Sequence, residues 1–271
     1  MRLHKPLFKQ SGFSIIELMI AITISLLLTA AVALLYTSSR TSARNQSDLA
    51  RVQETGRNAM YILTRSVRQG GFLADPTSWV NLQTIFPGPN SRPVQGTQGA
   101  AGANDTLMVS YQGSGTAAGV ADNRIVNCLG EAVPYPSATG TIRRDVFTIA
   151  TVAPNPEPVL YCDDGAGVTT RVPLVEGVEA MQILYGEDTD NPRDMTANRY
   201  VVASSVSNWY NVVSVRISIL VRSPNDIRLA PDTTNYNLLG ATFTPPTSPT
   251  DTSRRLRQLF TTVVNVRNLS N

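Results

Sequence analysis

The side chains that most enzymes use for catalysis are concentrated at the very start of this sequence. The only histidine is His4, and the only lysines are Lys5 and Lys9. If residues 1–12 are removed, the remaining chain lacks the groups for a Ser-His-Asp triad, a histidine metal site, a phosphate-binding lysine or a Schiff base. The sequence therefore does not predict an enzyme.

Glu17 is an acidic residue within a long apolar stretch that runs to Tyr36. A carboxylate inside a bilayer costs about 2.5–3.5 kcal/mol or more unless it is paired, so it needs a partner. No lysine or arginine occurs between Gly12 and Arg40, so the partner must come from another chain or from a new α-amino group. Cleavage after Gly12 would create such an amine at Phe13, four residues before Glu17.

An ordinary secretory signal is the alternative interpretation of this N-terminus. Ala30, Ala31 and Ala33 could provide a small-residue cleavage site after the apolar region. The apolar run is long for such a signal, however, and a signal would not need Glu17. Residues 13–36 are instead predicted to form a membrane-spanning helix, since this length corresponds to about 36 Å of helix.

The segment from Gly12 to Met19, with the sequence GFSIIELM, resembles the class III leader of type IV pilins and pseudopilins. The resemblance implies that a prepilin peptidase cuts between Gly12 and Phe13 and methylates the new N-terminus. It implies that Glu17 pairs with the amine of a neighbouring subunit during assembly. It also implies a single inner-membrane span with a periplasmic head, which later joins a pilus at the cell surface.

The rest of the chain is predicted to divide at the end of a second helical segment. Residues 37–69 lack proline, and Leu49, Val52, Met60, Leu63 and Val67 recur at helical spacing, which predicts an amphipathic helix. The glycines that follow should end it. Residues 70–271 are predicted to form a β-rich head, which makes an α+β fold with a long helix packed on an antiparallel sheet. The predicted strands are residues 106–111, 124–128, 144–151, 159–162, 178–185, 211–222 and 259–266.

Cys128 and Cys162 are the only cysteines. An even pair in a chain that crosses into an oxidising compartment favours a disulfide, although two unpaired buried thiols are the alternative.

An acidic segment in the head, with Asp188, Asp190 and Asp194, places several carboxylates close together. Calcium binds such oxygen clusters. The positions of Pro192 and Arg193 do not fit the glycine region of an EF-hand loop, and no closing glutamate follows. An acidic surface turn is therefore favoured, with calcium as the alternative and no other cofactor expected.

Charge is distributed so that nucleic acid is not an expected partner. From Phe13 onward the chain has 20 arginines and 20 acidic residues, so the basic pI comes from the leader. A DNA-binding pilin is an alternative that would require a basic stripe.

Several head motifs resemble the PilW minor pilins. They are Asn127-Cys128-Leu129-Gly130, Leu160-Tyr161-Cys162, Val175-Glu176-Gly177-Val178-Glu179, Tyr185-Gly186, the strand from Val215 to Arg222, Phe260-Thr261-Thr262-Val263 and Arg267-Asn268. The resemblance implies a low-abundance subunit of the complex that initiates a type IV pilus at its tip. Implied partners are other minor and major pilins, the peptidase, an inner-membrane assembly platform and a tip adhesin. The alternatives are a J-type pseudopilin of type II secretion and a membrane-anchored adhesive or binding protein.

Overall fold

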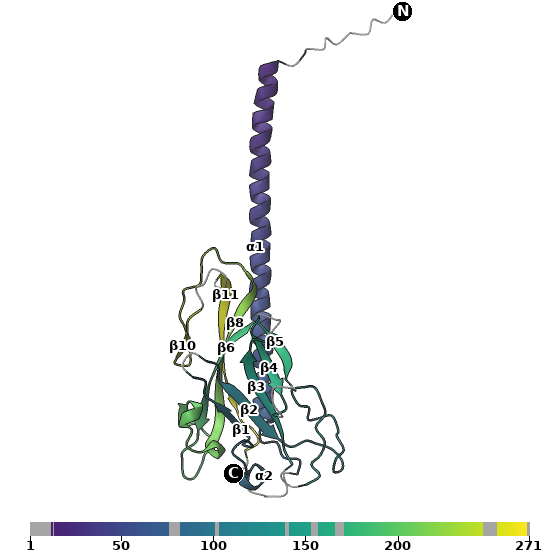
Figure 1. Cartoon of the computed structure of the whole chain (residues 1–271), viewed down its shortest axis with the longest axis vertical. Coiled ribbons are helices and arrows are strands. Elements are labelled where there is room, and N and C mark those ends of the chain that lie inside the picture. Colours follow the sequence, from purple (N-terminus) through teal and green to yellow (C-terminus); the bar gives the residue numbers. More distant parts are fainter. Residues whose placement is uncertain are drawn as a thin grey trace, which may run out of the picture. The chain divides into compact units, whose positions relative to one another are not determined.

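One continuous helix, α1 (Ile15–Gln69), contains both the apolar stretch and the amphipathic segment (Figure 1). It ends where the sequence predicted, because Gly71 has a φ of 75° that favours glycine. The side-chain amide of Asn268 donates to the carbonyl oxygens of Arg68, Gln69 and Gly70 at 3.0, 3.5 and 3.2 Å. A residue near the end of the chain thus pairs carbonyl groups that a helix terminus otherwise leaves unbonded.

The computed structural model describes residues 12, 14–75, 82–100, 103–138, 141–152, 157–165, 171–245 and 254–269. Phe13, the first residue after the predicted cleavage site, lies outside them. The chain forms two compact units, Met1–Ser47 and Asp48–Asn271.

The second unit contains two antiparallel sheets rather than the single sheet predicted. The five-stranded sheet has the order β1-β2-β3-β4-β5, and the four-stranded sheet has the order β11-β8-β6-β7. A separate hairpin pairs β9 with β10. The strands are β1 (Val94–Thr97), β2 (Thr106–Tyr111), β3 (Arg143–Ala150), β4 (Val159–Asp163), β5 (Val172–Glu176), β6 (Val178–Glu187), β7 (Arg199–Val201), β8 (Val212–Asp226), β9 (Tyr236–Leu238), β10 (Ala241–Phe243) and β11 (Arg255–Asn265). The short helices are α2 (Leu82–Ile85) and the 3₁₀ turns Ala203–Ser205 and Trp209–Asn211.

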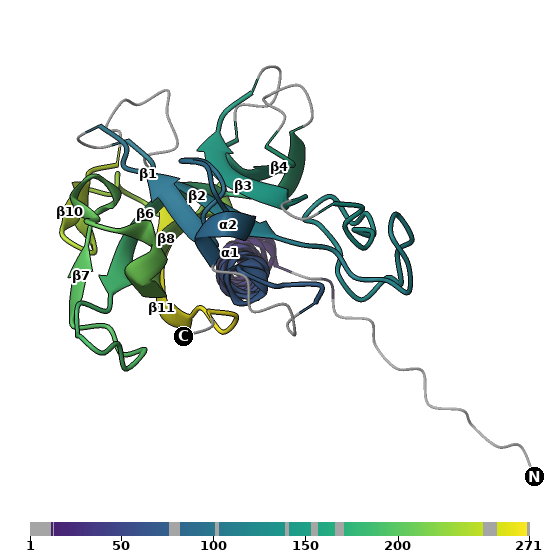
Figure 2. The same ribbon diagram turned by 90° about the horizontal axis from the view of Figure 1, so that it is seen from below.

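Both sheets and the C-terminal part of α1 contribute to one apolar core (Figure 2). The buried face of α1 carries Val52, Gly56, Ala59, Leu63 and Val67, as helical spacing predicted for most of them. Leu49, predicted to join this face, is instead exposed. At Gly56 a β-carbon would collide with the ring of Phe260 on β11, so glycine permits the close approach of helix and strand.

Strand β8 differs from the sequence prediction in its burial. Alternating residues predicted one apolar face and one solvent face, yet Ser214, Ser218 and Leu220 on the second face are also buried. The hairpin of β9 and β10 covers part of that face, because Leu220 packs in a small cluster with Leu238, Tyr236 and others. The chain between residues 223 and 251, predicted as a loop, therefore includes a hairpin that buries the outer face of the sheet.

The predicted strand at residues 124–128 is wrong. This segment makes only an isolated bridge between Val126 and Ala132. The side chain of Asn127 accepts hydrogen bonds from the backbone N–H groups of Leu129 and Glu131, which closes a tight turn instead. The other six predicted strands are present, with ends shifted by up to four residues.

Candidate functional site

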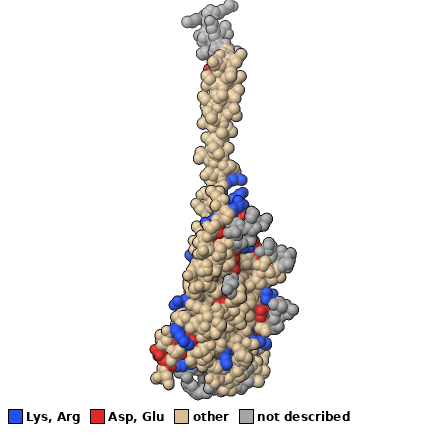
Figure 3. Space-filling model, turned by 60° about the vertical axis from the view of Figure 1, so that its left-hand side comes forward, with Lys and Arg blue, Asp and Glu red and all other residues tan. Residues whose placement is uncertain are grey.

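Glu17 lies in the first turn of α1, on a helix whose apolar side chains are exposed along its N-terminal part. Ile15, Ile16 and Leu18 around it are 80%, 67% and 57% exposed. Figure 3 shows a surface without charged residues along most of this stretch, with acidic atoms near its start. By length and composition α1 can cross a membrane, and it is the one described helix that can.

The other polar side chains within this apolar stretch bond to their own helix. The hydroxyls of Thr23, Ser25 and Thr29 donate to the carbonyl oxygens of Ile20, Ala21 and Ser25 at 2.8, 2.7 and 2.7 Å. Such bonds satisfy a hydroxyl without water. Glu17 has no corresponding partner among the residues that the structure describes. These three positions of the helix are therefore compatible with an apolar environment, whereas Glu17 needs a donor from outside the helix.

Gly12 is the other residue of the predicted processing site that the structure describes. A β-carbon there would meet no atom within 4 Å, so packing within this chain does not require a glycine. A requirement for glycine at this position would therefore come from contact with another molecule. Cleavage before Phe13 stays a prediction, since Phe13 lies outside the described residues.

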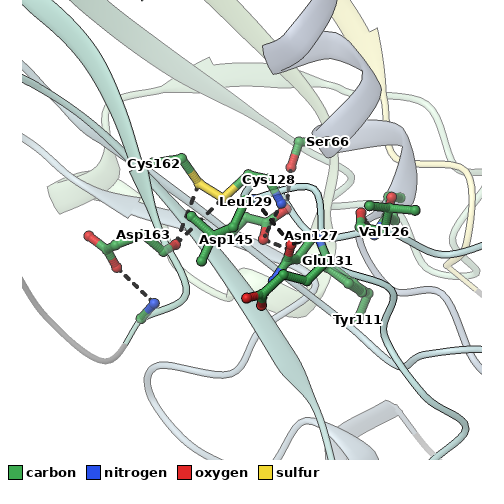
Figure 4. Close-up of a disulfide and its surroundings, with 12 residues drawn as sticks. Ser66, Tyr111, Val126, Asn127, Cys128, Leu129, Glu131, Asp145, Cys162 and Asp163 are labelled. Carbon is green, nitrogen blue, oxygen red and sulfur yellow. Dashed lines mark hydrogen bonds between the residues drawn. A yellow bond between two sulfur atoms is a disulfide. The ribbon is translucent and has the colours of Figure 1, made fainter. Parts of the chain in front are cut away.

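Cys128 and Cys162 form a disulfide, as the sequence favoured, with their Cα atoms 6.2 Å apart. Cys162 lies on the buried strand β4, and Cys128 lies on the tight turn that Asn127 closes. Figure 4 shows how the bond joins the turn to the sheet beside Asp145. Hydrogen bonds and the packing of Ile125 against the core also attach this segment to the head.

Asp145 is a buried carboxylate at the centre of this region, and its burial was not predicted from the sequence. It accepts hydrogen bonds from the Tyr111 hydroxyl at 2.9 Å, the Cys128 N–H at 3.2 Å and the Ser66 hydroxyl at 3.4 Å. It thereby connects β2, the disulfide turn and α1 to β3 (Figure 4). The alternation along β3 could have indicated this burial, because Asp145 lies two residues before Phe147 and shares its buried face.

Burial raises the pKa of Asp145 to about 6, although the hydrogen bonds from Cys128, Tyr111 and Ser66 oppose the increase. At pH values between the pKa of an unfolded aspartate, about 3.9, and this folded pKa, the folded state binds more protons than the unfolded state. The free energy of unfolding contributed by this group therefore falls as pH rises through that window.

We expect Asp145→Asn to remove this dependence while keeping an acceptor for Tyr111 and Cys128. Its stability relative to the wild-type protein should rise between about pH 4 and pH 7, by up to about 3 kcal/mol. Denaturant unfolding of the purified full chain at several pH values measures the difference. Carboxylates with lowered pKa values, such as Glu187, contribute equally to the stability of both proteins, so their contributions cancel in that difference. Glu131→Gln, which removes an exposed carboxylate on the same turn, is the control. A flat difference for Asp145→Asn would contradict the prediction.

The structure brings Asp188, Asp190 and Asp194 together, with carboxylate oxygens within 4.8 Å of one another. Each carboxylate also accepts at least one hydrogen bond from a group within the same loop. Asp188 accepts from the N–H groups of Asp190 and Met195, Asp190 accepts from the Asn198 amide, and Asp194 accepts from the Thr196 N–H. Arg193 lies 3.8 Å from Asp188. These contacts describe a hydrogen-bonded acidic turn, and calcium binding there stays a prediction.

Trp209 and Tyr210 fill space at the edge of the core. The rings of Trp209 and Tyr185 meet edge to face, with centroids 4.8 Å apart. The Tyr210 hydroxyl donates to the Phe86 carbonyl at 2.9 Å, and the Arg92 guanidinium lies over its ring. Both aromatics therefore have structural roles within the head.

Comparisons with known proteins match two parts of the chain to protein families. Residues 7–33 match the prokaryotic N-terminal methylation motif. Residues 146–268 match the family described as Type IV Pilus-assembly protein W, or PilW. The structure of a type IV-like pilin from Thermus thermophilus is 15% identical, covers 84% of this chain and 99% of its own, and has a TM-score of 0.39. No curated protein matches the chain.

Proposed function

We propose that this type IV pilin-like protein, whose head is similar to the PilW family, is a minor pilin that helps to initiate assembly at the tip of a type IV pilus. The observation that carries the proposal is Glu17. It is a carboxylate on an apolar helix in which the hydroxyls of Thr23, Ser25 and Thr29 have partners, and it has none among the described residues. A subunit that leaves the membrane for a fibre can find that partner on a neighbour.

In this proposal the segments of the chain have successive tasks. Residues 1–12 are a leader that the prepilin peptidase removes, and residues 13–36 hold the protein in the inner membrane. Residues 37–69 continue the helix into the head, which comprises residues 70–271 and lies in the periplasm. The inner-membrane assembly platform then moves the subunit into the fibre, where Glu17 pairs with the N-terminal amine of a neighbouring pilin.

A minor pseudopilin of type II secretion, of the J type, is the second candidate. The same leader and the same apolar helix with Glu17 support it equally, because both kinds of fibre are assembled from such helices. What distinguishes the two is the fibre that fails without the protein.

The test is the number of surface pili on a strain that lacks the gene, counted by electron microscopy. We expect loss of pili, restored by the intact gene but not by Gly12→Val. The mass of the purified Gly12→Val protein should show that its leader is retained, and a mature mass would contradict the proposed cut. Normal pili in the deletion strain would contradict the pilus role, and loss of exported enzymes would then support the pseudopilin.

A further inference from the structure

The solvent-facing side of α1 in the second compact unit carries four arginines, Arg51, Arg57, Arg65 and Arg68, called here the arginine face. All four are exposed, and they lie on the side of the helix opposite its buried residues. Tyr61, 63% exposed, lies among them. Glu54 is the one acidic side chain on this face, and it forms no ion pair with the arginines.

These arginines differ from most arginines of the sheets and loops in having no carboxylate partner. Among the residues that the structure describes, no acidic group lies within ion-pair distance of the arginine face. In residues 70–271, by contrast, many arginines are paired: Arg257 with Glu179 at 2.6 Å, Arg255 with Glu157 at 2.7 Å and Arg199 with Glu187 at 2.8 Å. The other ion-paired arginines are Arg124, Arg193, Arg222, Arg228 and Arg254.

Four positive charges along about 26 Å of one helix repel each other. Arg65 also helps to lower the pKa of the buried Asp145, which desolvation raises, but no ion pair among the described residues offsets the repulsion along the face. Arginine forms strong two-point hydrogen bonds with carboxylates, and these become stronger where a partner excludes water. We propose that the arginine face docks a carboxylate-rich surface of a different subunit of the same fibre. The identity of that fibre rests on the function proposed above, but the charge of the partner surface does not.

A second copy of this chain does not fit the arginine face. Two arginine faces would repel one another, which opposes helix-to-helix contact between copies. Many carboxylates in the head of a copy are also already engaged. Asp105, Asp145 and Asp232 are buried, and Glu157, Glu179 and Glu187 bind arginines. The exposed Asp190 and Asp194 accept hydrogen bonds within their own turn. A protein that cannot pack efficiently against itself is suited to low abundance among unlike subunits.

The test places a photoreactive group within the arginine face of the full chain in living cells. Tyr61→p-benzoylphenylalanine keeps an aromatic side chain at an exposed position. After irradiation, the crosslinked peptide is sequenced by mass spectrometry. We expect a peptide with an excess of Asp and Glu from another pilin-like subunit. A peptide from this same chain, a peptide without excess acid, or a phospholipid adduct would overturn the proposal.

Charge reversal provides the second measurement. In the crosslinking background, Arg51, Arg57, Arg65 and Arg68 are all changed to Glu, and we expect the crosslink yield to fall at least fivefold. The control is Arg143→Glu with Arg267→Glu, two exposed arginines outside the helix, which should leave the yield within twofold. A yield that the fourfold reversal does not change, with the protein folded and processed normally, would overturn the proposal.

The two proposals fail in different ways. If pili are normal without the gene, the pilus role is contradicted, yet an acid-rich crosslink to a secretion-fibre subunit would still support the arginine face. If pili are lost but the crosslink leads to a copy of this chain or to lipid, only the arginine face is contradicted.

Discussion

Glu17→Gln should reduce the recovery of this protein in sheared surface fibres at least tenfold, while its cellular amount and leader cleavage stay unchanged. The substitution keeps the size and polarity of the side chain but removes the charge that a neighbouring amine would pair. A carboxylate in the bilayer costs about 2.5–3.5 kcal/mol by insertion scales, which is enough to change a partition between membrane and fibre by more than tenfold. Quantitative immunoblots of fibre and membrane fractions measure that partition.

Thr23→Ala is the matched control for this experiment. The Thr23 hydroxyl lies on the same apolar helix but donates to the Ile20 carbonyl within it. Its removal should therefore not affect contacts with neighbouring subunits. We expect normal recovery of this variant. Equal recovery of Glu17→Gln and the wild-type protein would show that the charge has no role in assembly.

Loss of the Cys128–Cys162 disulfide should lower the free energy of unfolding of the head by about 3–4 kcal/mol. The two cysteines are 34 positions apart, and closing a loop of that length restricts the unfolded chain. The folded state is affected as well, because the turn that carries Cys128 donates to the buried Asp145. For a domain of this size the change corresponds to a decrease in Tm of about 10 °C.

The measurement compares the wild-type full chain, oxidised and reduced, with Cys128→Ser/Cys162→Ser by thermal unfolding. A pocket of about 190 Å³ reaches Cys128 beside α1, which offers a route for a small reductant. We expect the reduced protein and the double variant to unfold at similar temperatures. Reductant should have no effect on the double variant. A decrease of less than about 1 kcal/mol would show that packing alone holds the turn.

Structural features that depend on residues close together in the sequence could be predicted. The end of α1 follows from two glycines, and the strands β2, β4, β6 and β8 follow from apolar runs or alternation. The class of fold, a long helix with antiparallel strands, is confirmed. The hairpin of β9 and β10 was missed because its strands are short and flanked by prolines, and its burial depends on contact with Leu220 of β8.

The candidate site was predictable to the same degree. The disulfide followed from the number of cysteines and the compartment, and the isolation of Glu17 followed from the lack of basic residues nearby. Asp145 was missed because a single acidic residue in a strand is more often solvated than buried. Its partners Ser66, Tyr111 and Cys128 come from three separate elements, and no local pattern records that they converge.

The contact between Asn268 and the end of α1 makes the end of this helix depend on a residue 200 positions later in the chain. On the proposed route across the membrane, with the N-terminal helix inserted first, the side chain that caps this helix would cross long after the helix has entered. Strand β11, which carries Phe260 against Gly56 and closes one edge of the four-stranded sheet, crosses only shortly before. A half-exported head therefore has an uncapped helix and an open edge on β8. On the proposed route, the native fold of the head would therefore be complete only after residue 268 has crossed, so folding of the head would precede entry into a fibre.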